Sequence, residues 1–131
     1  MSQATTGMDP DSFEQFLNQL RRFVRERLIP AERAIMESDE IPADIVREMR
    51  EMGLFGLTIP EEHGGAGMNV RQYARTIHTI SYAMPAFRSL ISINIGMVCS
   101  ALQNGGTEAQ EAEWLPRLAA GETAAFGLTE P

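Results

Sequence analysis

The chain has 131 residues, of which 44% are hydrophobic, and a formal net charge of −7. This length and hydrophobic content predict one domain with a buried core rather than two domains. The acidic balance argues against a nucleic-acid partner, because neutralising phosphates requires an excess of clustered positive charge.

The residue types present exclude further chemistry. All eleven positively charged residues are arginine, which excludes Schiff-base catalysis and a lysine-based phosphate loop. Cys99 is the only cysteine, so neither an internal disulfide nor a multi-cysteine metal site is possible.

Residues 1–7 lack the charged and apolar regions of a secretory signal, and we expect a cytoplasmic protein. The apolar run from Ser89 to Leu102 is shorter than the roughly 20 residues of a membrane-spanning helix, so no span is expected.

The first helix is predicted to begin at Asp9 and Pro10, which are typical of a helix N-terminus. A stripe of apolar residues follows at three- and four-residue steps: Phe13, Phe16, Leu17, Leu20, Phe23, Val24 and Leu28. Pro30 should end or kink this helix. Residues 1–8 show no such stripe, and we expect them to be disordered, with the helical domain running from residue 9 to residue 122.

A second, short helix is expected from Ile41-Pro42 to Gly53, a residue typical of a left-handed helix end. Residues 53–68 are rich in glycine and should form a shaped loop. Three adjacent residues in this loop, Glu61, Glu62 and His63, carry side chains that could bind a metal. Adjacent side chains converge poorly on one ion, so no metal site is predicted.

The next helix is expected to start at Asn69 and to bury one apolar face. That face would contain Val70, Tyr73, Ala74, Ile77, Ile80 and Met84, with His78 on the opposite, exposed face. Residues 86–102 are apolar on nearly every side, which is typical of a helix in the middle of a bundle.

The last helix should begin with a capping box formed by Thr107 and Gln110, and should end at Gly121. Its predicted hydrophobic anchors are Trp114, Leu115 and Leu118. The run from Thr123 to Leu128 is predicted to be a strand. The expected fold class is therefore all-α, a bundle of five to six helices with a short C-terminal strand segment, in which residues 123–131 begin a following β-domain. Such a bundle could bind an aliphatic ligand or dock on a partner, and the residues alone name no reaction.

The C-terminal run Phe126-Gly127-Leu128-Thr129-Glu130-Pro131 resembles the flavin-contacting motif of the acyl-CoA dehydrogenase family. Three further stretches resemble that family. The glycine-rich loop does so in Gly53-Leu54-Phe55-Gly56-Leu57 with Pro60-Glu61-Glu62-His63-Gly64-Gly65-Ala66-Gly67, and the approach to the strand in Gly106-Thr107-Glu108-Ala109-Gln110 with Trp114-Leu115-Pro116-Arg117-Leu118-Ala119-Ala120-Gly121-Glu122. The first helix does so in Phe23-Val24-Arg25 with Leu28-Ile29-Pro30. The resemblance covers about residues 10–131 and implies the N-terminal helical domain of an FAD-dependent enzyme that dehydrogenates acyl-CoA thioesters at the α and β carbons.

The same resemblance implies the cofactor contacts and the partners. The backbone of Phe126 and Leu128 and the hydroxyl of Thr129 would face the flavin ring, and FAD would be the cofactor. An acyl-CoA substrate, an electron-transfer flavoprotein and assembly into a homo-oligomer, a tetramer or a dimer, are implied for the parent enzyme. The family's catalytic glutamate lies in a later domain, so no catalytic residue is expected in this chain. The chain alone should be inactive and should not hold FAD tightly.

A substrate pocket is implied on the apolar helix. Leu90, Ile93 and Met97, with Ser89 nearby, would line the slot for the acyl tail, and ordinary core packing is the alternative. Arg88 resembles an arginine that binds the distal carboxylate of the substrate in the glutaryl-CoA branch of the family. A structural ion pair or a helix cap is the preferred alternative for this arginine.

Two other functions remain open from the sequence. The chain could be a non-catalytic helical interaction module that has kept the scaffold. It could also be a domain of a related flavin oxidase or monooxygenase.

Overall fold

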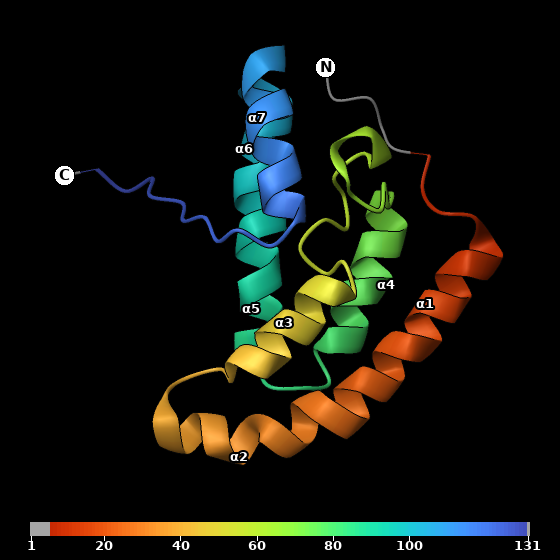
Figure 1. Ribbon diagram of the computed structural model, residues 1–131, viewed down its shortest axis with the longest axis vertical. Helices are drawn as coiled ribbons and strands as arrows, with labels where there is room; N and C mark the ends of the chain where they lie inside the picture. The colour runs from red at the N-terminus through yellow and green to blue at the C-terminus, as the bar shows by residue number, and fades with distance from the viewer. Residues whose placement is uncertain (1–5, 131) are drawn as a thin grey trace.

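The computed structural model describes residues 6–130, which form an all-α bundle (Figure 1). Some helices follow one another without a break, so that five continuous helices are present in the described part of the chain. They are α1 (Pro10–Phe23) joined to α2 (Ile29–Ser38) by the π-helical stretch Val24–Leu28; α3 (Ala43–Glu51); α4 (Val70–Ile80); α5 (Pro85–Ser92) joined to α6 (Ser100–Gly105) by the π-helical stretch Ile93–Cys99; and α7 (Glu108–Ala119). A short 3-10 turn, Glu61–His63, lies in the glycine-rich loop. The expected bundle of five to six helices is confirmed.

The helix starts lie where the capping residues predict them. The Asp9 side chain accepts hydrogen bonds from the amides of Asp11 and Ser12 at the start of α1. Asn69 opens α4 and Thr107 opens α7, each in a complete capping box with the glutamine three residues later. These bonds satisfy amides that have no partner within the helix, and so they fix where each helix begins.

Pro30 kinks the first helix without ending it. Figure 1 shows α1 and α2 meeting at an angle, and the π-helical stretch lies just before the proline. Pro30 has no N–H to donate to the carbonyl of Glu26, and its ring crowds that carbonyl. The wider turn of Val24–Leu28 accommodates this loss, and the helix continues to Ser38.

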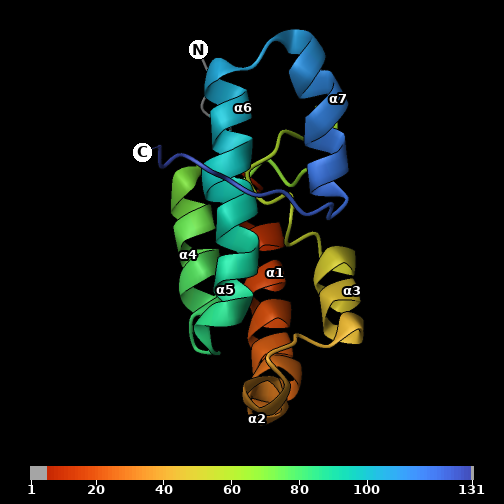
Figure 2. The same cartoon turned by 90° about the vertical axis from the view of Figure 1, so that its left-hand side faces the viewer.

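The core consists of two adjoining clusters of buried residues. The larger one is formed by α1, α3, α4, α5 and the glycine-rich loop, with Leu20, Phe55 and Phe87 among its fully buried members. The smaller one joins Ile59 of the loop and Cys99 to Leu115 and Leu118 of α7. Figure 2 shows the resulting shape, with α7 folded back beside α6 and the loop behind them.

The buried face of α4 differs from the expected one. Its buried residues are Gln72, Thr76, Thr79 and Ile80, whereas Val70 is 82% exposed. The hydroxyls of Thr76 and Thr79 donate to the carbonyls four residues earlier, each at 2.9 Å. A threonine satisfied in this way can be buried like an apolar residue, which a pattern of apolarity alone does not register. His78 is exposed, as expected.

The apolar helix from α5 to α6 is buried on one side only. Ile91, Ile95 and Cys99 are buried, whereas Ile93 is 41% and Met97 46% exposed. The expectation that this helix is enclosed on every side is therefore wrong for these described residues. By length and composition alone, Pro85–Gly105 could cross a membrane, but core helices of globular domains share this property, and one face of this helix packs into the core.

Trp114 is less buried than an anchor of α7 should be. It is 40% exposed, and the guanidinium of Arg117 lies over its ring, 4.4 Å from the centroid. The buried anchors of α7 are the other two predicted residues, Leu115 and Leu118. Tryptophan has both an apolar ring and a polar N–H, so it is often only partly buried. The guanidinium of Arg117 covers one face of the ring through a cation–π contact.

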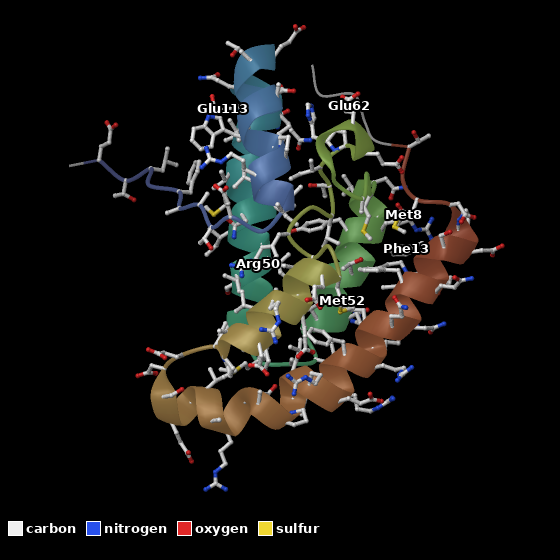
Figure 3. All side chains as sticks on the ribbon, in the orientation of Figure 1. Met8, Phe13, Arg50, Met52, Glu62 and Glu113 are labelled. Atoms are coloured by element: carbon white, nitrogen blue, oxygen red, sulfur yellow. The ribbon has the colours of Figure 1, made fainter. Side chains whose placement is uncertain are left out.

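The two ends of the described chain also differ from expectation. Residues 122–130 form no strand, because a strand is stable only when a neighbour pairs with its backbone, and residues 6–130 offer none. Met8 lies in the segment expected to be disordered, yet the Gln72 side chain accepts from its amide at 2.9 Å and donates to its carbonyl at 2.8 Å. Met8 packs against the cluster that contains Phe13 (Figure 3). The expectation for residues 1–5 falls outside the described residues.

Candidate functional site

The exposed side of the apolar helix and the C-terminal segment lie against each other. The segment leaves α7 at Gly121, whose φ of +95° suits a glycine, and then crosses the helix formed by α5 and α6 (Figure 2). The side chain of Asn94 holds the crossing point, because its Oδ1 accepts from the amide of Ala124 at 2.8 Å. This bond holds the start of the segment that carries the predicted cofactor residues against the helix that carries the predicted substrate residues.

The predicted substrate residues follow one another along this helix. Ser89 and Leu90 are half-buried on α5, and Leu90 packs against the core. Ile93 and Met97 follow at three- and four-residue steps and are partly exposed. Steps of three and four place side chains on one helix face, so these residues form an apolar strip open to a ligand or to a further domain. Ile93 and Met97 lie in a π-helical stretch, and such stretches are frequent at functional sites.

Arg88 precedes this strip and is half-buried. Within residues 6–130 its guanidinium makes no ion pair or hydrogen bond. Burial raises the pKa of Tyr73, and the positive charge of Arg88 opposes that rise. A half-buried guanidinium without an anionic partner is suited to receive a carboxylate from outside the domain.

The predicted cofactor residues are presented to solvent. Phe126 is 41% exposed, Leu128 76% exposed, and Thr129 is exposed as well. The backbone groups of residues 125–130 make no hydrogen bond within the described chain. A run of free amides and carbonyls with one adjacent hydroxyl fits the edge of a flavin ring, which alternates hydrogen-bond donors and acceptors.

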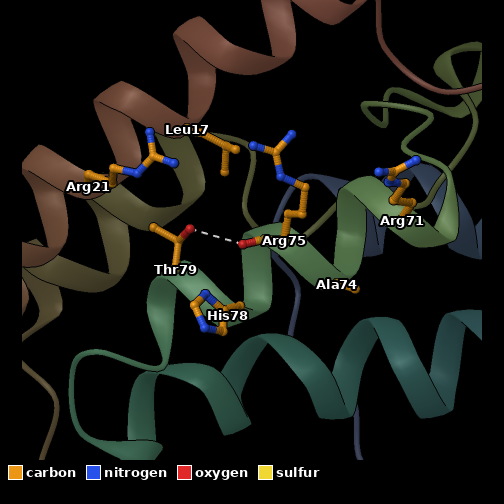
Figure 4. A pocket seen from close by; sticks show the side chains of 7 residues that line it. All are labelled: Leu17, Arg21, Arg71, Ala74, Arg75, His78 and Thr79. Atoms are coloured by element: carbon orange, nitrogen blue, oxygen red, sulfur yellow. Dashed lines mark hydrogen bonds between the residues drawn. The ribbon is translucent and has the colours of Figure 1, made fainter.

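A separate groove between α1 and α4 was not predicted from the sequence. A cavity of about 320 Å³ lies there, lined by Leu17, Arg21, Arg71, Ala74, Arg75, His78 and Thr79 (Figure 4). Arg75 pairs with Glu14 at 2.6 Å and lies over the ring of Phe13. The arginines at positions 71 and 75, one helical turn apart, are the sequence signal that could have indicated it.

No metal site is present among the described residues. In residues 6–130 no three His, Cys, Asp or Glu side chains are arranged to hold a metal ion. In the glycine-rich loop, Nε2 of His63 lies 3.8 Å from Oε1 of Glu62.

Comparisons with known proteins identify the family of this chain. The family described as "Acyl-CoA dehydrogenase, N-terminal domain" matches residues 10–122. An acyl-CoA dehydrogenase of Bacillus subtilis (strain 168) is 34% identical over 113 residues, which are 86% of this chain and 30% of the relative. A (2S)-methylsuccinyl-CoA dehydrogenase of Cereibacter sphaeroides is 40% identical over 130 residues, covering 96% of this chain and 23% of the relative.

A solved structure agrees with these relatives. The crystal structure of a glutaryl-CoA dehydrogenase from Mycobacterium smegmatis in complex with FADH2 matches with a TM-score of 0.75 and 31% identity. The match covers 87% of this chain and 29% of that one. The fold and these matches thus define a class of helical N-terminal domains found in larger acyl-CoA dehydrogenases. The chain belongs to the acyl-CoA dehydrogenase family, as its N-terminal domain, and spans less than a third of the length of these relatives.

Proposed function

We propose that this chain is the N-terminal domain of an FAD-dependent acyl-CoA dehydrogenase, to which it contributes the acyl-chain pocket and one edge of the flavin site. The observation that carries the proposal is the junction at Asn94. It holds Ala124 against the helix whose Ile93 and Met97 are partly exposed, and the backbone that follows, residues 125–130, has free hydrogen-bonding groups.

In this proposal the chain binds and orients, and the rest of the protein completes the chemistry. The apolar strip covers the acyl tail and excludes water from it, as expected for contact between apolar surfaces. The backbone of Phe126 and Leu128 and the hydroxyl of Thr129 hold the flavin edge. FAD held there would supply the hydride acceptor for the β carbon of the thioester. The base that removes the α-proton is contributed from outside residues 1–131.

The proposed partners follow from the same assignment. An acyl-CoA thioester is the substrate and an electron-transfer flavoprotein reoxidises the enzyme. The complete protein assembles into a homo-oligomer, so that surfaces exposed in this domain become covered.

Arg88 favours a substrate with a distal carboxylate. Its guanidinium is half-buried, and no described residue neutralises it. Two of the relatives, the methylsuccinyl-CoA and glutaryl-CoA dehydrogenases, are named for CoA thioesters of dicarboxylic acids. We therefore propose that Arg88 binds the free carboxylate of such a thioester.

Steady-state kinetics of the complete protein test this function and the role of Arg88 together. Wild type should oxidise acyl-CoA thioesters with an artificial electron acceptor. Arg88→Ala should raise KM for a dicarboxylic thioester at least about tenfold, because it removes a charge-assisted hydrogen bond. KM for the monocarboxylic thioester of equal chain length should change little.

Arg33→Ala is the matched control, since Arg33 is 88% exposed on α2 and pairs only with Glu37 among the described residues. It should leave both KM values unchanged. Equal effects of Arg88→Ala on the two thioesters would contradict the carboxylate-binding role. Absence of any thioester oxidation by wild type would contradict the function itself.

A further inference from the structure

Asn94 is an amide side chain buried on the core side of the apolar helix. It is 1% exposed, and both ends of its side chain are bonded. Nδ2 donates to the carbonyl of Leu90 at 2.8 Å, and Oδ1 accepts from the amide of Ala124, thirty residues further on, also at 2.8 Å. Burying an amide side chain is unfavourable unless its polar atoms form hydrogen bonds. An apolar side chain would pack here without that requirement, so packing alone does not explain an asparagine at this position.

Asn104 shows what a purely local asparagine does in the same helix. Its Nδ2 donates to the carbonyl of Ser100 at 2.7 Å, which is the same bond to the fourth residue back. Asn104 is exposed and reaches no distant segment among the described residues. The bond to Ala124 is therefore the feature that distinguishes Asn94.

Ala124 is the point at which the C-terminal segment is held. From Thr123 to Glu130, no other backbone group forms a hydrogen bond within the described chain. Ala124 also packs against the smaller core cluster. Where the backbone continues in an extended conformation past Ala124, as in a β-strand, the N–H groups of Ala124, Phe126 and Leu128 point to the same edge. Fixing the first of them determines which edge the other two present, and a slip by one residue would reverse it.

We propose that Asn94 is a positioning residue that sets the register of residues 124–129 against the apolar helix, so that Phe126 and Leu128 present their backbone edge to the flavin. The role rests on the proposed function, because the flavin is what that edge receives. Asn94 also joins the helix that carries the acyl-chain strip to the segment that carries the cofactor contacts, so one side chain places the two sites relative to each other.

The first experiment uses the 131-residue chain and needs no cofactor. Amide hydrogen exchange of Ala124, followed by NMR, should be at least about tenfold slower in wild type than in Asn94→Leu, which keeps the side-chain volume and removes the acceptor. Asn104→Leu should leave Ala124 unchanged. Equal exchange of Ala124 in wild type and Asn94→Leu would overturn the anchor.

The second experiment uses the complete protein and FAD. Titration of the apoprotein with FAD should give a Kd about tenfold higher for Asn94→Leu than for wild type and Asn104→Leu, with a shifted flavin absorbance spectrum. Wild-type FAD affinity and spectrum in Asn94→Leu would overturn the positioning role while leaving the proposed function intact. A complete wild-type protein that binds no FAD would overturn both.

Ala124→Pro provides the same test from the other side of the bond. Proline removes the donor N–H, and residue 124 lies outside every helix, so the bundle should keep its helical circular dichroism. This variant should weaken FAD binding as Asn94→Leu does, and it keeps the proposal testable if Asn94→Leu does not fold. Unchanged FAD affinity in a folded Ala124→Pro protein would overturn the proposal.

Discussion

Arg27 lies in the π-helical stretch between α1 and α2, and its guanidinium joins this helix to α3. It donates to both carboxylate oxygens of Glu48 and, at 2.8 Å, to Asp44. Hydrogen bonds from Arg27 hold the pKa of Glu48 and the pKa of Asp44 below their ordinary values of 4.5 and 3.8. The planar guanidinium meets Glu48 through two nitrogens, a geometry that a lysine could not reproduce.

This cluster makes stability depend on pH in the acid range. A carboxylate whose pKa is lowered by folding stabilises the native state above its ordinary pKa, and the contribution is lost as the pH falls below that value. Arg27→Gln should therefore lower the thermal unfolding midpoint at pH 7, by no more than about 5 °C because the pair is partly exposed. At pH 3, below the ordinary pKa of both carboxyls, the difference between variant and wild type should be smaller than at pH 7. A difference that is as large at pH 3 as at pH 7 would contradict the ion-pair explanation.

At the scale of the elements, the sequence predicted best what depends on neighbours along the chain. The helix starts at Asp9, Asn69 and Thr107 were predictable because the capping residue bonds within its own first turn. The kink before Pro30 was predictable because the missing N–H is a local property. Among the site residues, Ile93 and Met97 were assigned to a substrate slot by the family resemblance, and their partial exposure was not predicted from the sequence.

What depends on distant segments was not predictable from the sequence. Thr76 and Thr79 are buried because α1 and α5 happen to cover them, and their hydroxyls bond within α4. The burial of Asn94 depends on Ala124, thirty residues away, and an amide within an apolar run was the signal that the sequence offered. The prediction of a strand at residues 123–128 was wrong for the described chain. A sequence with β-propensity forms a strand only where a neighbouring strand can pair with its backbone.

The one-sided burial of the apolar helix leads to a test at this scale. Ile91 is fully buried and Ile93 is 41% exposed. The two residues are two positions apart, so their side chains lie on different faces of the helix. Ile91→Ala should reduce the free energy of unfolding by about 2–5 kcal/mol through the cavity that it leaves. Ile93→Ala should cost less than about 1 kcal/mol. Urea denaturation measures both, and similar costs would contradict the orientation of this helix.

At the scale of the whole molecule, the domain exposes apolar side chains that an isolated globular protein would cover. Ile93, Met97, Phe126 and Leu128 are all partly or largely exposed. Ile93 and Met97 belong to the apolar helix, and Phe126 and Leu128 belong to the C-terminal segment that crosses it (Figure 2). Contiguous apolar surface of this kind marks a site of contact with a ligand, a further domain or another subunit. In the proposed enzyme, the acyl chain, the flavin and the following domain cover it.

This exposed surface should make the isolated chain associate with itself. Sedimentation velocity should show a weight-average mass that rises with concentration, and the double variant Ile93→Glu/Met97→Glu should reduce that rise. Val70→Glu is the matched control, because Val70 is also exposed but lies on α4. A wild-type chain that stays monomeric at every concentration would contradict the prediction.

Anaerobic titration of the complete protein with an acyl-CoA thioester tests the central claim most directly. The oxidised protein should be yellow with bound FAD, and addition of the thioester should bleach the flavin absorbance to an endpoint near one equivalent per flavin. The α,β-unsaturated thioester should be recovered as the product. A colourless protein, or a flavin that no acyl-CoA thioester bleaches, would contradict the account.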